Sequence, residues 1–129
     1  MNRRLLQVHA AVVWLFVAAI VVQVFLAGAA ITQLGGSGTF ASHVDFGYSI
    51  GILALVLLVT AVIARGGRAA ISASLGLFVL YVIQTLLPGL KGSFPWASAL
   101  HPVNALVLFA LAAWYGRRAW RAASAASAA

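Results

Sequence analysis

Four long apolar runs constrain the fold of this chain more than any other feature of its sequence. They cover about residues 5–31, 44–64, 69–87 and 98–116. A helix needs about 20 apolar residues, within a range of about 17–25, to cross the hydrocarbon core of a bilayer. Only 7% of the 129 residues are charged, whereas soluble domains average about 25%. The sequence therefore predicts an all-α, integral membrane four-helix bundle with up-and-down topology.

Neither a β-barrel nor a signal peptide accounts for these runs. Strands of a membrane barrel alternate apolar and polar residues over about ten positions, whereas these runs are apolar on every face. The first run follows Arg3 and Arg4, as a signal peptide would, but it is longer than an apolar core of about 7–15 residues. We expect a single domain over residues 1–121 and an Ala/Ser-rich tail over 122–129 that frays.

The basic residues predict the orientation of the helices. Only Lys91 lies in a loop on one side of the predicted spans. The other seven basic residues lie on the opposite side: Arg3, Arg4, Arg65, Arg68, Arg117, Arg118 and Arg121. Because cytoplasmic loops carry an excess of Lys and Arg, we expect a multi-pass protein of the cell membrane with both termini in the cytoplasm. The net charge of +7 is then a topology signal, and no nucleic-acid partner is expected, since such binding needs a groove-sized basic surface.

The sequence also contains a weak internal repeat. The first run includes VQVFLAG (22–28), and the third ends in IQTLLPG (83–89). Each segment leads through an outer loop to a histidine that opens the next run, His43 in the first copy and His101 in the second. The pattern predicts a duplicated helical hairpin, with two parallel copies related by an axis along the membrane normal.

The repeat places His43 and His101 at the same depth, on helices that are diagonal neighbours in an up-and-down bundle. Adjacent helix axes lie about 8–10 Å apart, so the diagonal is on the order of 13 Å. Two neutral imidazoles across such a gap are natural axial ligands for a haem iron. We therefore predict that these two histidines bind a metal. The alternative is that both are interfacial histidines that meet water.

Gly47 and Gly51 follow His43 at steps of four residues, so all three share one helix face. Glycine on this face would let a bulky ring approach the backbone, which assigns both glycines to the cofactor site. The alternative is an ordinary close-packing motif between membrane helices.

Three amides complete the predicted cofactor site. Gln23 and Gln84 would hydrogen-bond across the bundle or to the edge of a ligand, because polar groups inside a membrane carry a functional presumption. Asn104, one turn beyond His101, would bond a propionate or a neighbouring helix.

Two further polar residues receive structural roles. His9 lies near the cytoplasmic end of the first run, far from the other histidines, and is predicted to be packed or interfacial. Asp45 is the only acidic residue, and capping of the second helix is its expected role.

Several chemistries are excluded by composition. The chain has no cysteine and a single acidic residue, so thiol nucleophiles, paired carboxylates and a Ser/His/Asp set are absent. No buried carboxylate or lysine is available for ion pumping. Independent catalytic activity is therefore not expected, and any redox activity would depend on a cofactor.

The whole chain resembles one four-helix half of the haem A synthase family. The matching segments are GAAITQLGGSG (28–38) before the first histidine, Gln84 with its Pro-bearing loop, and Leu100-His101-Pro102. The chain is also similar to a family of small bacterial four-helix membrane proteins of uncharacterised function, which carry the same Gln-x-Phe-Leu-x-Gly and His-Pro segments. The synthase resemblance implies that His43 and His101 hold haem.

Two departures limit what this resemblance implies. The synthases carry an acidic residue shortly before the first histidine and, in many members, cysteines in the outer loop, but residues 40–42 here read FAS. We therefore expect a bis-histidine protein that binds haem b for electron transfer or haem handling, rather than for oxidation of a haem methyl group. Homodimerisation would recreate the two-half architecture. The alternatives are a haem-free accessory or structural subunit of a larger membrane complex, and a lipid- or quinone-binding protein that uses the Gln23/Gln84 cleft.

Overall fold

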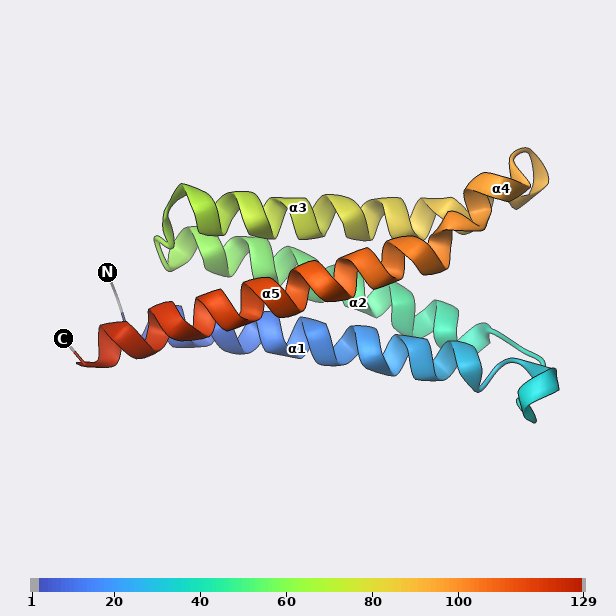
Figure 1. Ribbon diagram of the computed structural model, residues 1–129, viewed down its shortest axis with the longest axis horizontal. Helices are drawn as coiled ribbons and strands as arrows, with labels where there is room; N and C mark the ends of the chain where they lie inside the picture. Colours follow the sequence, from blue (N-terminus) through green and yellow to red (C-terminus); the bar gives the residue numbers. More distant parts are fainter. Residues whose placement is uncertain (1–2, 129) are drawn as a thin grey trace.

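The computed structural model describes residues 3–128, which form a bundle of long helices (Figure 1). In chain order the elements are α1 (Arg3–Gly28), η1 (Thr32–Leu34), α2 (Ala41–Ile63), α3 (Gly67–Leu86), η2 (Leu87–Gly92), α4 (Pro95–Ser98) and α5 (Leu100–Ala128). Four stretches are long and apolar enough to cross a membrane: α1, α2, α3 extended by η2, and α4 continued by α5. The fold is thus the predicted four-helix bundle of a multi-pass membrane protein.

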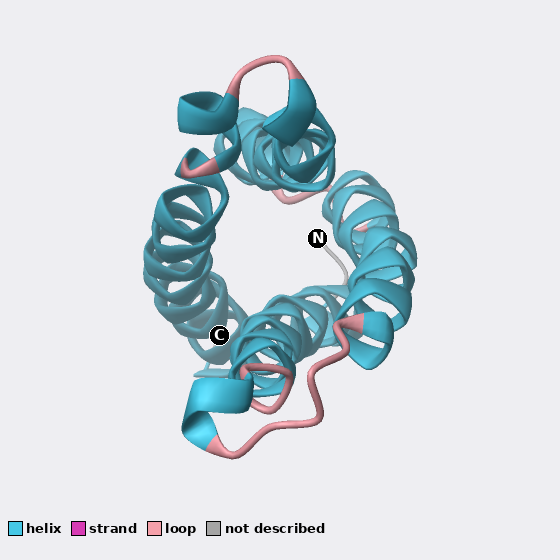
Figure 2. Cartoon of the chain, turned by 90° about the vertical axis from the view of Figure 1, so that its right-hand side faces the viewer, coloured by secondary structure: helices cyan, strands magenta, loops and turns pink. Residues whose placement is uncertain are grey.

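The four long helices form a ring in which each packs against two neighbours. α1 contacts α2 and α5, and α3 contacts the same two helices from the other side. Consequently α2 and α5 are diagonal partners, as the up-and-down topology requires, and Figure 2 shows the ring in end view. Both described ends of the chain and the α2–α3 link lie at one end of the bundle, whereas η1 and α4 lie at the other.

The link between α2 and α3 is a tight turn. Arg65 and Gly67 both adopt positive φ angles, of 50° and 80°. Glycine takes such a conformation without steric cost, whereas arginine does so rarely. This turn makes α2 and α3 an antiparallel pair, so His43 and the segment around Gln84 return to the same end of the bundle.

The bundle core is made of apolar side chains and small residues. Val13, Phe16, Leu57 and Ser74 are its largest fully buried side chains. Many large apolar side chains face outward instead, where lipid replaces water as their surroundings. Because lipid is as apolar as the core, close packing and interhelical hydrogen bonds hold such helices together.

The structure describes most of the Ala/Ser tail, which the sequence analysis expects to fray, as part of a helix. Helix α5 continues through this segment to Ala128, and residue 129 lies outside the described residues. Alanine has the highest intrinsic helix propensity. In addition, Ala123 is only 3% exposed and belongs to the same core cluster as Leu6 of α1. Propensity and packing therefore both favour the helix.

The predicted capping role of Asp45 is wrong. Helix α2 begins at Ala41, three residues before the predicted start, so Asp45 lies inside the helix and is exposed. The N-cap position belongs to Phe40, whose side chain makes no capping bond. The hydroxyl of Thr39 accepts a hydrogen bond from the N–H of Ala41 at 3.3 Å and so satisfies one free donor at this helix end.

Candidate functional site: a histidine pair beside an apolar cavity

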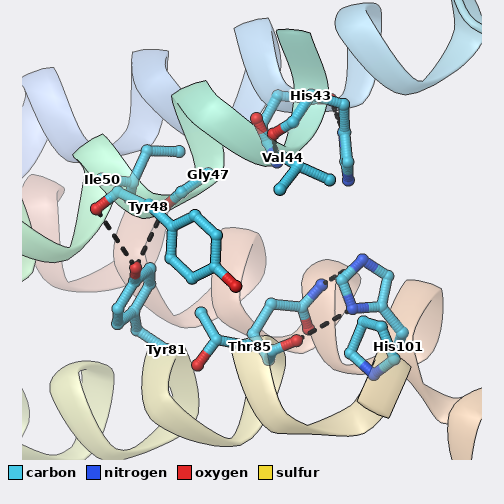
Figure 3. A pocket seen from close by; sticks show the side chains of 11 residues that line it. His43, Val44, Gly47, Tyr48, Ile50, Tyr81, Thr85 and His101 are labelled. Carbon is cyan, nitrogen blue, oxygen red and sulfur yellow. Dashed lines mark hydrogen bonds between the residues drawn. The ribbon is translucent and has the colours of Figure 1, made fainter. Parts of the chain in front are cut away.

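His43 and His101 project from the diagonal helices α2 and α5 into the same space at one end of the bundle (Figure 3). Their ring centroids are 6.1 Å apart and the ring planes meet at 69°. Both side chains are half-buried. The two side chains thus bring imidazoles from separate hairpins together across the bundle.

The same backbone contact orients both imidazoles. Nδ1 of His43 lies 3.0 Å from the carbonyl oxygen of Gln23, and Nδ1 of His101 lies 2.9 Å from the carbonyl oxygen of Gln84. A carbonyl oxygen can only accept, so each Nδ1 carries the proton and donates. In a neutral imidazole this leaves a lone pair on Nε2. The two copies of the repeat therefore share one tautomer and one supporting contact.

The glutamine side chains treat the two histidines differently. Nε2 of Gln23 donates to the carbonyl oxygen of His43 at 2.7 Å, which makes the pairing between these two residues reciprocal. Nε2 of Gln84 instead lies 3.1 Å from Nε2 of His101 and donates to its lone pair. Among the described residues, Oε1 of Gln23 is buried without a hydrogen-bond partner. The site thus contains one unsatisfied acceptor and one imidazole nitrogen covered by an amide.

Asn104 bonds a neighbouring helix, which was one of its two predicted roles. Its Nδ2 donates to Oε1 of Gln84 at 2.7 Å and to the carbonyl oxygen of Leu80 at 3.0 Å. These contacts hold the Gln84 amide with its Nε2 toward His101. Asn104 therefore positions a residue of the site from α5.

Gly47 and Gly51 make room for protein side chains in this structure. A Cβ at Gly47 would lie 2.7 Å from Nε2 of Gln23, and a Cβ at Gly51 would lie 2.7 Å from the hydroxyl of Tyr81. That hydroxyl donates to the carbonyl oxygen of Gly47 at 3.0 Å. The space that was expected to admit a cofactor ring is occupied by Gln23 and Tyr81, as in the close-packing alternative. Tyr81 was not among the predicted site residues.

Two cavities lie beside the histidine pair. The larger has a volume of about 480 Å³ and the smaller about 130 Å³. Both are bounded by Gln23, His43, Ile50, Tyr81, Gln84 and His101. The rest of the larger cavity is apolar, with walls that include Phe16, Leu106 and Phe109. Its volume is within the range of about 300–1,000 Å³ typical of ligand sites, and an apolar wall with a few polar groups is their usual composition.

His9 lies in a separate polar cluster toward the other end of the bundle. It is 3% exposed, and its two ring nitrogens lie 2.9 Å from Oγ1 of Thr60 and 2.6 Å from the hydroxyl of Tyr115. Of the two predicted roles, packed or interfacial, the structure shows the packed one. Tyr115 is 6% exposed and lies in the core. Neither Thr60 nor Tyr115 carries a sequence signal that would pair it with His9.

These features define the class of protein as a four-helix membrane protein with a paired-histidine site at one end of the bundle. A model of the DUF6220 family, a family of unknown function, matches residues 23–90, slightly more than half of the chain, and the chain belongs to this family. The matched segment begins at Gln23 and includes His43 and Gln84. No curated protein and no solved structure matches the chain.

Proposed function

We propose that this protein binds a b-type haem between His43 and His101 and serves in electron transfer or haem handling. The observation that carries the proposal is the shared tautomer of the two histidines. Each donates its Nδ1 proton to a glutamine carbonyl and presents Nε2 as a lone pair. Metal-binding histidines almost always donate their other ring N–H to a carbonyl, a carboxylate or water, because this contact orients the ring and raises its basicity.

The separation of the two rings fits one metal atom held between them. Metal–imidazole bonds are about 2.0–2.1 Å long, so two histidines that share one metal bring their rings close together. The observed centroid separation of 6.1 Å is in keeping with such a pair. His43 and His101 reach this separation from the diagonal helices α2 and α5.

The donor set favours a metal that carries most of its ligands with it. Within residues 3–128 no group of three or more His, Cys, Asp or Glu side chains could hold a metal ion. A bare structural zinc takes four protein ligands and a catalytic one usually three. A pair of axial histidines is instead the ligand set of an iron whose other four positions belong to a macrocycle.

The residues of the chain would then perform distinct tasks. His43 and His101 would hold the haem, and the carbonyls of Gln23 and Gln84 orient the two rings. The hydrogen bond from the Gln84 amide to Nε2 of His101 would have to break before this nitrogen could bind a metal. The apolar wall of the 480 Å³ cavity would surround most of the ligand with hydrocarbon. A bound haem would supply one-electron chemistry.

Two further lines support the proposal. The resemblance to one half of a haem A synthase depends on the segments that contain His43 and His101. The excess of arginine at the end of the bundle opposite these histidines favours cytoplasmic termini in the cell membrane, which would place the haem in the outer half of the bilayer. A second copy of the chain, as a homodimer, would recreate the two-half architecture of the synthases.

A visible spectrum tests the proposal directly. The protein, expressed in haem-replete cells and purified in detergent, should show a sharp Soret band and, after dithionite, a reduced α-band. His43→Ala and His101→Ala should each lose the six-coordinate spectrum. His9→Ala is the matched control and should keep it, because His9 lies in the other cluster. A colourless wild-type preparation that also takes up no added haem would rule the proposal out.

A haem-free accessory subunit is the second candidate, and one observation favours it. Gln23 and His43 already bond each other reciprocally, and Gln84 covers Nε2 of His101, so these contacts can serve as interhelical ties. In that case His43→Ala should lower the thermal stability of a colourless protein, and the wild type should co-purify with a larger membrane complex.

A further inference from the structure

We propose that the histidine site is loaded sideways from the bilayer, through an opening between α1 and α5. This inference rests on the proposed function, because it concerns how a haem would reach the histidine pair. It adds that the haem would come from the lipid of the bilayer, that it would enter between α1 and α5, and that residues at the edge of this opening would control its entry.

The larger cavity is lined mainly by residues of α1 and α5. Of its lining residues, six come from α1 and six from α5, whereas α2 and α3 contribute two each. The α2 and α3 residues are His43, Ile50, Tyr81 and Gln84. The cavity therefore extends from the histidine pair toward the α1–α5 side of the bundle.

The rim on this side is apolar and uncovered. Val21 and Val24 of α1 and Leu106 and Phe109 of α5 line the cavity, yet all four are exposed. Val24 is 58% exposed and Leu106 is 69% exposed. Because these residues lie within membrane-spanning stretches, lipid surrounds them, and the opening faces the bilayer interior.

The depth of the rim supports a membrane route. Val24 and Val21 precede the end of α1 by four and seven residues, and Leu106 and Phe109 follow the start of α5 by six and nine. At 1.5 Å per residue the rim lies about 6–14 Å below the helix ends. One leaflet of a hydrocarbon core about 30 Å thick covers this depth.

The α1–α5 side differs between the two ends of the bundle. At the opposite end α1 and α5 pack closely, since a Cβ at Gly116 would lie 3.2 Å from the Trp14 ring. From there the two helices diverge toward the histidine end (Figure 1). Across the bundle, the Tyr81 hydroxyl ties α3 to the Gly47 carbonyl of α2, and the cavity there is only about 130 Å³.

The chemistry of the opening fits a lipid-dissolved, flat, largely apolar molecule with a few polar edge groups. The rim offers only hydrocarbon, whereas the inner end of the cavity is lined by the imidazoles of His43 and His101. A molecule that enters from the membrane exchanges one apolar environment for another and meets polar partners only at the site.

Cross-linking of the opening provides the test, because the chain has no native cysteine. The test variant is the double substitution Val24→Cys with Leu106→Cys, studied haem-free in vesicles. A bismaleimide joins the two cysteines and so links α1 to α5. The matched control carries Val44→Cys with Thr85→Cys, joined across α2 and α3 beside the smaller cavity. Haem is supplied either dissolved in donor vesicles or bound to albumin in water, and the growth of the Soret band is followed.

The α1–α5 link should slow uptake by an order of magnitude or more, and the α2–α3 link should change it little. Uptake should also follow the haem content of the bilayer rather than that of the water. Equal rates with both links, a larger effect of the α2–α3 link, or faster loading directly from albumin would overturn the lateral route.

Two controls separate this result from a failure of haem binding itself. When the α1–α5 link is introduced after loading, the Soret band should persist, which shows that the link spares the site. Independently of haem, Val24→Cys should react with a lipid-soluble maleimide and not with a charged one. Reaction with the charged reagent would contradict the lipid-facing opening, whereas a wild type that binds no haem would overturn the proposed function together with this route.

Discussion

His9 and Tyr115 are 106 positions apart in the sequence, yet Nε2 of His9 lies 2.6 Å from the Tyr115 hydroxyl in the bundle core. The hydroxyl of Thr60 donates to the carbonyl of Leu57, so its oxygen accepts from Nδ1 of His9. A neutral His9 therefore receives a hydrogen bond from Tyr115 at Nε2. The Tyr115 hydroxyl also lies 3.3 Å from the carbonyl oxygen of Ala70, so all four long helices meet at this cluster.

The His9 cluster should stabilise the bundle without contributing to the histidine-pair site. Interhelical hydrogen bonds in membranes average about 0.6 kcal/mol and reach about 1.7 kcal/mol. Tyr115→Phe should lower the free energy of unfolding by about this amount. His9→Ala should lower the free energy of unfolding by more. The substitution leaves a cavity, and it removes the partner of buried hydroxyl groups, where each buried group left without a partner costs about 1–3 kcal/mol.

Unfolding in mixed detergent micelles, followed by circular dichroism, measures both changes. Val8→Ala is a suitable control because Val8 is the neighbour of His9 in α1 but is half exposed to lipid. A His9→Ala protein as stable as Val8→Ala would contradict the role of the cluster.

Gly47→Ala should disturb the histidine site through Gln23. The added Cβ would lie 2.7 Å from Nε2 of Gln23, so this amide must give up its bond to the carbonyl of His43. Overpacking of this kind typically costs about 1–3 kcal/mol.

The matched control is Gly76→Ala in α3, where no described atom lies within 4 Å of the added Cβ. This change should be neutral or should stabilise the helix by about 0.5–1 kcal/mol, the usual advantage of alanine over glycine. The thermal midpoints of the two variants in one detergent give the comparison. Equal midpoints would show that Gln23 moves aside freely.

Gln84→Leu should retain the haem-binding site and bind added haem at least as tightly as the wild type. The Gln84 side chain covers Nε2 of His101, whereas the orienting contact to Nδ1 comes from the Gln84 backbone carbonyl, which the substitution leaves in place. Removal of a group that competes for the same nitrogen raises the apparent affinity. Titration of the haem-free protein with haem measures the change, and loss of the Soret band would show that the amide itself holds the cofactor.

Cysteine labelling should place the two ends of the bundle on opposite sides of the membrane. Single cysteines at Ser37, in the loop after η1, and at Ser124, near the end of α5, are unambiguous probes because the native chain has none. In intact cells a membrane-impermeant maleimide should label Ser37→Cys and spare Ser124→Cys until the cells are opened. The reverse pattern would invert the orientation expected from the arginines.

The four membrane spans and the diagonal relation of α2 and α5 were predictable from the sequence. Both follow from the length of apolar runs and from short links, which are local properties of the chain. The repeat also predicted that His43 and His101 reach the same end of the bundle. Helix ends were less predictable, because α5 continues through the Ala/Ser segment where Ala123 finds a buried position.

By itself, then, the sequence determined that this chain is a four-helix membrane bundle with two histidines brought to one end of it. Only the tertiary structure decided which atoms meet: the Gln23 carbonyl with Nδ1 of His43, the Tyr81 hydroxyl with the Gly47 backbone, and His9 with Tyr115. The reason is physical. Helices that are apolar on all faces have no preferred side toward the core, so the rotation of each helix about its axis is set by close packing and by the few polar groups that must find partners.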